Sequence, residues 1–533
     1  MDLLPLLAGL AVVLLTWATG KALLPDRSQL ARSRWEDLSI SYLLGTAIVV
    51  IVGNTVLALG LSMTVVTAVF VVAGLAAIAS VWKRRGAPIA ATNLPRPAFA
   101  LLMVLAFASI AATLAYPINE FDPMFHFAYK GKVLAFTGTP FDASLTGMLN
   151  ADGTLADYGR IVTHPNYPLG IPILEALVAT LSEWHDRWVQ APLALWAACL
   201  PGAVFFGLRC INLQAAGVAA LIAATTPILY ARNIGAKGWQ SLDFAGLSQE
   251  LSLGAGADLP VTALLAVAVA LILTGMKRSW TWLQLLGGLC LAGAAAMKNE
   301  GQALLGVVLL ALIVSGLLLP RRGAQQDPRL AESNSADGTQ AKPKMRASWT
   351  IAIAAVLALL PWLSIRSALP AIDENYTQHF TVENILHYLG GGPELVEKSP
   401  KVIVGRDQEL LDNPPARIDH LPGYFWEEFS DWRSWGLLWL LLLIALPWRP
   451  KDLADGIHRW LGALVFGGVL LYFLILLVTP WYLPLLREKG IPERLLIHLL
   501  GPICMLIGLR FNFFGQSAAI SSDEATPNGQ ASE

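Results

Sequence analysis

Apolar runs of about 20 residues recur along this chain, and they constrain its fold more than any other feature. A run of that length in lipid must satisfy its backbone hydrogen bonds internally, as a helix does. Of 533 residues, 55% are hydrophobic and only 14% are charged, whereas a soluble domain has about a quarter charged residues. The sequence therefore predicts an all-α polytopic transmembrane helical bundle of about 13 spans, with external loops carrying short amphipathic or re-entrant helices.

The loops between these runs differ in charge. Lys and Arg gather in alternate loops, and the positive-inside rule places those loops in the cytoplasm. The other polar loops then lie outside, provided that 167–181 does not cross the membrane; Pro168 and Pro172 break that stretch. The net charge of −1 suggests neither nucleic acid nor an acidic partner. The predicted spans are 3–23, 39–60, 63–82, 98–116, 188–208, 214–231, 259–276, 282–297, 301–319, 348–369, 435–448, 460–480 and 494–511.

Changes in composition divide the chain into segments. The polar stretch before the tenth predicted span has few apolar residues and should be flexible. The four cysteines lie in or beside apolar runs, so no disulfide framework is expected. We expect an N-terminal three-helix addition over 1–97, a transmembrane core over 98–320 with a first external loop at 117–187, a cytoplasmic linker over 321–347, a C-terminal transmembrane region over 348–511 with an external loop at 370–434, and a disordered tail over 512–533.

Charged and aromatic residues concentrate in 119–132, directly behind an apolar run. If a helix begins at Asp122, then Asp122, His126 and Lys130 share one stripe. Asp before Pro is also a good helix start, and on that interpretation Asp122 is only a cap. Charged groups at a bilayer surface are costly and usually functional. We therefore interpret the stretch as an active-site loop, in which Asp122 and Glu120 are candidate catalytic residues and His126 and Lys130 candidate substrate-binding residues.

Two further candidates follow in the same loop, and one begins a later span. His164 and Tyr167 lie in a proline-rich turn whose backbone must be extended or turned. A membrane re-entry turn with an interfacial tyrosine explains them equally simply. Asp258 precedes a long apolar run, where helix capping is the simple explanation and a site at the membrane surface the other.

The last candidates lie at two short external turns. Lys298 and Glu300 occupy a tight turn, where they must pair, snorkel or face a hydrated cavity. Arg494 and His498 are four residues apart and share a helix face at the outer boundary. A guanidinium with a histidine one turn deeper suits a lipid-linked phosphate. Mutual neutralisation of Lys298 and Glu300, and snorkelling of Arg494, are the alternatives.

Taken in order, these motifs resemble the GT-C superfamily of polytopic glycosyltransferases, which includes protein O-mannosyltransferases and lipid A aminoarabinose transferases. The resemblance covers 98–510 in a poorly characterised bacterial branch. It rests on short motifs: Glu120-Phe121-Asp122, Phe125 to Lys132, His164 to Pro168, Gly256 to Pro260, Lys298 to Gly301 and Arg494 to Pro502. The sequence departs from an adjacent Asp-Glu pair, because Phe121 separates the two carboxylates.

The resemblance implies transfer of a sugar from a polyprenyl-phosphate donor to a glycan, lipid or protein acceptor. Asp122 would be the general base, with Glu120 as the second candidate. The other site candidates would bind substrate. The transfer would invert the configuration at the anomeric carbon. The enzyme would lie in the bacterial inner membrane with its active site facing the periplasm or exterior. No metal site is predicted, although Glu120 or Asp122 could hold a divalent cation.

Two other classes of function compete with an enzyme. A transporter or flippase of a lipid-linked saccharide would place charges within the spans and break helices in matching halves. In this sequence the span centres are largely uncharged and the loops hold the polar groups, which favours surface chemistry. A non-catalytic membrane scaffold is the second competitor, and it requires none of the candidate residues.

Overall fold

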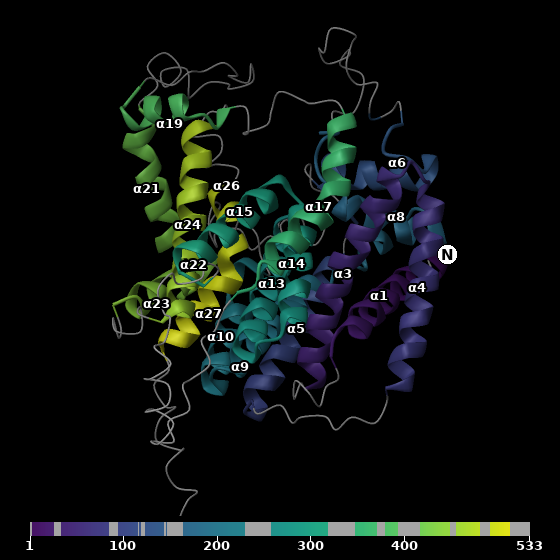
Figure 1. Ribbon diagram of the computed structural model, residues 1–533, viewed down its shortest axis with the longest axis horizontal. Helices are drawn as coiled ribbons and strands as arrows, with labels where there is room; N and C mark the ends of the chain where they lie inside the picture. The colour runs from purple at the N-terminus through teal and green to yellow at the C-terminus, as the bar shows by residue number, and fades with distance from the viewer. Residues whose placement is uncertain are drawn as a thin grey trace, which may run out of the picture.

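The computed structural model describes 3–25, 33–84, 94–115, 117–118, 123–142, 145, 164–229, 257–317, 347–369, 379–392, 416–447, 455–479 and 491–511. Glu120, Asp122, nearly all of the predicted linker, and the predicted tail lie outside these residues. Every secondary-structure element of the described chain is a helix, which confirms the predicted fold class. Figure 1 shows the helices as one assembly, with α19 and α21 at one upper corner and α6 and α8 at the other.

The described part of the chain has helices of two length classes. Eight are long and apolar enough to cross a membrane, so the chain is an integral membrane protein. They are α1 (Leu3–Leu23), α3 (Arg34–Ala58), α4 (Met63–Lys83), α5 (Arg96–Ala115), α13 (Asp258–Arg278), α17 (Thr350–Ala368), α24 (Gly456–Val478) and the stretch Ile491–Arg510. Shorter apolar helices are α8 (Gly170–Leu181), α9 (Trp196–Arg209), α10 (Leu213–Thr225), α14 (Thr281–Ala295) and α15 (Asn299–Val314).

Other short elements join these helices. Ile491–Arg510 is itself divided into α26 (Ile491–Leu496), η7 (Ile497–Leu499) and α27 (Leu500–Arg510). A single turn of 3-10 helix stands at η2 (Trp188–Gln190) and at η3 (Pro227–Leu229). The remaining elements are η1 (Pro123–Ala128), α6 (Tyr129–Thr137), α19 (Val382–Leu389), α21 (Arg417–Ser430), α22 (Trp432–Trp435) and α23 (Leu438–Ala445).

Two of the predicted spans are wrong as continuous helices. The predicted span 435–448 is split at Gly436, whose φ of 58° lies in the left-handed region, and the helix that follows has only 8 residues. The predicted span 188–208 is split after η2, and α9 begins only at Trp196. Pro192 lies in that break, where proline lacks a backbone donor and disfavours helix at the preceding residue. Local breakers therefore divide runs that hydropathy alone joins.

The stretch 167–181 forms a helix too short to cross the membrane. α8 has 12 residues and is about 18 Å long at 1.5 Å per residue, against about 30 Å of hydrocarbon. Its residues from Gly170 to Ala179 are all buried, and it packs against α6, α1 and α4. Its length agrees with the prediction that this stretch does not cross.

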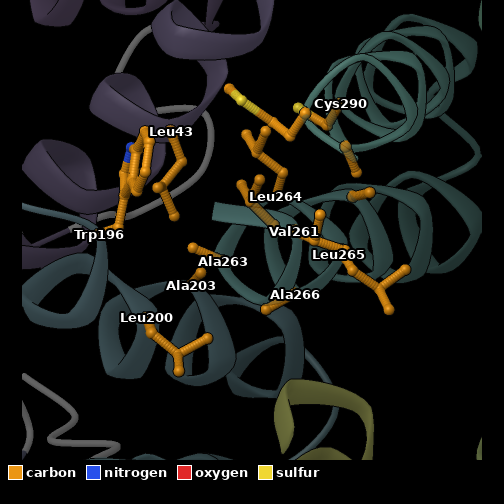
Figure 2. Close-up of a cluster of buried hydrophobic side chains, with 14 of the residues drawn as sticks. Leu43, Trp196, Leu200, Ala203, Val261, Ala263, Leu264, Leu265, Ala266 and Cys290 are labelled. Atoms are coloured by element: carbon orange, nitrogen blue, oxygen red, sulfur yellow. The ribbon is translucent and has the colours of Figure 1, made fainter. Parts of the chain in front are cut away.

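α13 is the central helix of the bundle. Its most apolar 18-residue window is completely buried, and it packs against α14, α9, α27 and α3. Figure 2 shows Leu264 of α13 between Cys290 of α14 and the neighbouring side chains of Leu43 (α3) and Trp196 (α9). Because all these side chains are apolar, burial of their surface stabilises one continuous core.

The N-terminal helices share this core. α3 packs against α9, α14 and α17, and α1 packs against α3. Gly20 and Gly45 lie at the α1–α3 crossing, where a Cβ on either would overlap the carbonyl of Ser41 or Thr16. Small residues allow two backbones to approach closely in this way.

The start of α3 is held by buried ion pairs. Glu36 pairs with Arg209 of α9, and Asp37 pairs with Lys21 of α1. Ser33 and Glu36 form a capping box, in which each side chain accepts from the backbone N–H of the other. These contacts attach three helices to one another near the ends opposite to Asp258.

Tight backbone packing also joins α8 to the turn between α14 and α15. The backbone N–H of Gly170 donates to the Ala296 carbonyl at 2.9 Å. A Cβ on Gly170 would lie 2.5 Å from the sulfur of Met297 and 2.6 Å from the Ala296 oxygen. The space therefore admits only glycine unless the turn moves.

We predict that Gly170→Ala lowers the stability of the protein by about 1–3 kcal/mol, because the methyl group overpacks a backbone contact. The matched control is Gly306→Ala in α15, where a Cβ would meet nothing within 4 Å. Thermal unfolding of the detergent-solubilised protein measures both. An unchanged midpoint in Gly170→Ala would show that the turn relaxes freely.

Candidate functional site

Asp258 is the centre of a buried polar cluster. Its Oδ1 accepts from Lys298 Nζ at 2.6 Å, and its Oδ2 accepts from Arg494 Nε at 2.9 Å. Nε2 of His498 lies 3.2 Å from Oδ1. These side chains come from α13, from the α14–α15 turn, and from the continuous stretch of α26 and η7, so three separate parts of the chain meet at one carboxylate. We call Asp258, Lys298, Glu300, Tyr472, Arg494 and His498 the carboxylate cluster.

Glu300 and Tyr472 complete the carboxylate cluster. Lys298 Nζ lies 3.2 Å from Glu300 Oε1 as well as close to Asp258. The Tyr472 hydroxyl of α24 lies 2.6 Å from Nδ1 of His498. Lys298 is buried, which by itself lowers its pKa, but the carboxylates of Asp258 and Glu300 outweigh burial and the pKa is raised. Lys298 therefore carries its charge in the buried cluster.

Local sequence positions two of the charged groups in this cluster. Lys298 is extended, with φ −155° and ψ 153°, and directly precedes α15. Gly301 permits this turn, because a Cβ there would overlap the Ala294 carbonyl. Asp258 occupies the first turn of α13, where the helix dipole favours a negative charge. Helix starts thus bring one carboxylate and one ammonium group together.

A second cluster holds four other candidate residues, His126, Lys130, His164 and Tyr167, which we call the histidine cluster. The ring centroids of His126 and His164 are 4.4 Å apart, and His164 stacks on Tyr167 at 4.6 Å. The buried Lys130 ammonium donates to the carbonyls of His164 and, at 3.1 Å, Tyr167. Lys130 therefore fixes the backbone turn that presents the two rings.

Burial changes the proton affinity of Lys130. Desolvation lowers its pKa well below the usual value. Carbonyl oxygens accept its hydrogen bonds, and no carboxylate within the described residues forms an ion pair with it. Lys130 thus differs from Lys298, whose charge two carboxylates balance.

The helix that leads into this cluster begins where the sequence predicts. η1 is a π-helix that starts at Pro123, directly after Asp122, and continues into α6. His126 and Lys130 both contact the 164–167 turn, so these two members of the predicted stripe share a face. Single π-turns occur frequently at functional sites. Asp122 and Glu120 lie outside the described residues, so their roles stay predictions.

One backbone hydrogen bond links the two segments of the chain that carry the clusters. The Gly170–Ala296 hydrogen bond of 2.9 Å joins the chain three residues after Tyr167 to the chain two residues before Lys298. All nine described candidates therefore belong to one pair of linked clusters: His126, Lys130, His164, Tyr167, Asp258, Lys298, Glu300, Arg494 and His498. Their individual roles stay predictions.

Sequence reasoning missed two buried polar residues, Tyr472 within the carboxylate cluster and Glu175 of α8. Tyr472 is a single hydroxyl inside an apolar run, which composition cannot distinguish from an interfacial ring. Glu175 of α8 is fully buried against Gly131, and neither carboxylate oxygen has a hydrogen-bond partner in the described chain. Burial and the charge of Asp186 raise the pKa of Glu175 well above its usual value. A lone glutamate in an apolar stretch was the available signal.

A further acidic pair lies beside Arg494. Ser434 donates to Glu493 at 3.4 Å, and Trp435 Nε1 donates to Glu428 at the same distance. Burial, followed by the negative charge of Glu493, raises the pKa of Glu428 to about 8. Glu428 of α21 is therefore largely protonated at neutral pH, which limits the negative charge next to the carboxylate cluster.

No metal site can be assigned in the described chain. Within those residues there is no group of three or more His, Cys, Asp or Glu side chains that could hold an ion. Asp258, the best placed carboxylate, is already bonded to cationic groups. Glu120 and Asp122, which could hold a divalent cation, lie outside the described ranges.

No protein-family model and no curated protein matches the sequence. Three solved structures of an oligosaccharyltransferase of Archaeoglobus fulgidus are similar to it. For the apo form the TM-score is 0.42 and the sequence identity is 11%. The match covers 77% of this chain and 50% of the archaeal chain. For the complex with an inhibitory peptide and a dolichol-phosphate the TM-score is 0.40 and the identity is 10%. The match covers 78% of this chain and 50% of the archaeal chain. For the form tethered to an acceptor peptide the TM-score is 0.39 and the identity is 10%. The match covers 77% of this chain and 49% of the archaeal chain.

This chain thus spans about half the length of the structures it matches. The archaeal protein is a GT-C enzyme, the superfamily that the sequence motifs resemble. Identities of 10–11% and TM-scores of 0.39–0.42 make this a distant likeness. Function is therefore inferred from the two clusters.

We predict that Asp258→Asn destabilises the protein by about 3–5 kcal/mol, because it leaves two buried cations without their shared carboxylate. Lys298→Met should lower the stability by less, since the Arg494 guanidinium still balances the charge of Asp258. The double variant should lose less than the sum of the two, because both changes affect one interaction. Unfolding followed by tryptophan fluorescence measures all three. Strict additivity would mean that the two groups act independently.

Proposed function

We propose that the protein is a membrane glycosyltransferase. It moves a sugar from a polyprenyl-phosphate donor to an acceptor hydroxyl on the extracytoplasmic face, with Asp122 as general base and inversion at the anomeric carbon. The observation that carries the proposal is the convergence of Lys298, Arg494 and His498 on one buried carboxylate. These are the groups that would otherwise hold a phosphate.

The carboxylate cluster has the chemistry of a phosphate site. Asp258 presents two anionic oxygens to an ammonium, a guanidinium and an imidazole. A phosphate oxygen accepts the same kinds of hydrogen bond, and arginine and lysine are the usual residues that bind it. The donor phosphate would therefore take over contacts that Asp258 makes in this structure.

The histidine cluster supports a place for the second substrate. The Gly170–Ala296 hydrogen bond links its segment to the turn that carries Lys298, and its chain leads back to Asp122, the residue before η1. Two imidazoles and a phenol provide stacking surface and hydrogen-bond groups for a sugar or its acceptor. Lys130 would keep the turn that carries them in place.

The reaction assigns one task to each group. Asp122 takes the proton of the acceptor hydroxyl as the oxygen attacks the anomeric carbon. The bond between that carbon and the phosphate oxygen breaks, and the polyprenyl phosphate leaves with the electron pair. Lys298 and Arg494 stabilise its negative charge, which is worth more in a buried site than in water. Burial of the cluster also excludes water that would hydrolyse the donor.

The proposal places the protein in a bacterial inner membrane with the site facing the periplasm or exterior. Its support is the placement of basic residues in alternate loops. The sugar donor is the partner that the carboxylate cluster would recognise. The acceptor class, whether glycan, lipid or protein, stays open.

We predict that the purified protein binds one member of a panel of polyprenyl-phosphate sugars, and that Arg494→Ala weakens this binding by about tenfold, since a charge-assisted hydrogen bond contributes about 1.5–3 kcal/mol. Arg459→Ala is the matched control, because Arg459 is exposed and lies at the N-terminal end of α24, whereas Tyr472 of the carboxylate cluster lies near the C-terminal end. Thermal stabilisation by each lipid measures binding. If no donor in a broad panel binds, the phosphate site is disproved.

We also predict that Asp122→Asn retains donor binding and the fold but lowers transfer by at least about 100-fold, because the general base is lost. Glu120→Gln serves as the comparison and should reduce transfer less. Release of free polyprenyl phosphate, measured by chromatography, reports turnover. Full activity in Asp122→Asn would show that a residue other than Asp122 is the general base. Movement of intact donor between leaflets without cleavage would instead indicate a transporter.

A further inference from the structure

The hydrogen bonds of His498 determine which ring nitrogen carries hydrogen. Its Nε2 lies 3.2 Å from Asp258 Oδ1, and its Nδ1 lies 2.6 Å from the Tyr472 hydroxyl. A carboxylate only accepts, so Nε2 must donate and carry a hydrogen. Nδ1 is then the nitrogen that can gain a proton. The hydroxyl of Tyr472 can donate to a bare Nδ1 and can accept from a protonated one, so both charge states are hydrogen-bonded.

The charges around His498 leave no surplus of positive charge. In the described chain the carboxylates of Asp258 and Glu300 balance the cations of Lys298 and Arg494, and the first turn of α27, 500–503, adds no ionisable group. A neutral imidazole therefore sits in a site that cannot accept another anion without cost. The groups gathered around Asp258 and His498 are Lys298 and Glu300 from the α14–α15 turn, Tyr472 from α24 and Arg494 from α26. Glu493 of α26 accepts a hydrogen bond from Ser434.

A glycosyl phosphodiester adds one negative charge to this buried site. Burying an uncompensated charge is costly, and buried groups usually change protonation instead. We propose that His498 takes up a proton at Nδ1 when the phosphodiester of the donor binds, so that donor binding is coupled to proton uptake. The inference rests on the proposed function, since it requires the phosphate to contact Lys298 and Arg494.

The coupling has a definite direction. A group that holds its proton more tightly in the complex than in the free protein makes binding stronger as pH falls. Binding of one proton gives at most about a tenfold change in affinity per pH unit. The affinity should therefore rise from about pH 8 to about pH 6, the range in which an imidazole ordinarily titrates.

The experiment uses the full chain in lipid nanodiscs and a polyprenyl methyl phosphodiester as probe. A diester keeps one negative charge across this pH range, whereas a monoester has a second ionisation near pH 6 that would produce its own pH dependence. We expect binding about tenfold tighter at about pH 6 than at about pH 8. Calorimetry in two buffers of different ionisation enthalpy should show uptake of up to one proton.

Two histidine variants separate the coupling from general effects of pH. His498→Gln keeps a donor toward Asp258 but has no imidazole, so it should bind the probe with affinity that hardly changes with pH. His458→Gln is the matched control: His458 is bonded to Asp455 at the other end of α24, and the variant should keep the wild-type dependence. Proton uptake by the wild-type protein tests the inference even if His498→Gln does not fold.

The outcomes are distinguishable. Tighter binding at low pH that disappears in His498→Gln, with proton uptake, supports the coupling. Binding that does not change with pH and takes up no proton overturns it but leaves the proposed function standing. A pH dependence that persists in His498→Gln also overturns it. Absence of diester binding at every pH disproves the phosphate site, and the inference with it.

Discussion

The structure depends on the balance of charge at Asp258. A carboxylate buried at the start of the central helix is tolerable only because an ammonium and a guanidinium bond to it at 2.6 Å and 2.9 Å. Those cations come from parts of the chain about 40 and 236 residues away. One electrostatic requirement thus fixes how α13, the α14–α15 turn and α26 meet. The same arrangement keeps two cationic groups largely shielded from solvent.

A backbone contact links the segment of the histidine cluster to the turn that carries Lys298. Gly170 donates to the Ala296 carbonyl, and Gly301 closes the turn that follows. Neither contact leaves space for a side chain. The position of His164 and Tyr167 relative to Lys298 is therefore determined by two glycines and by Lys130, whose ammonium bonds the 164–167 carbonyls.

Sequence reasoning predicted the helical membrane fold and named the described residues that converge, because hydropathy and charges at helix ends are local properties. Charges in short turns had to find partners near the bilayer, so Lys298, Glu300 and Arg494 could be singled out without coordinates. Tyr472 and Glu175 could not, since their roles depend on which helix packs beside them. The break at Gly436 was also missed, because a positive φ is decided by packing as much as by residue type.

The crossing of α1 and α3 has a mechanical consequence. At Gly20 and Gly45 the two backbones touch with no side chain between them, and ion pairs fasten the same end of α3 to α9 and α1. There is no compressible layer at this junction that could absorb a displacement. A displacement of α1 would therefore pass directly to α3, which packs against α14 and α17.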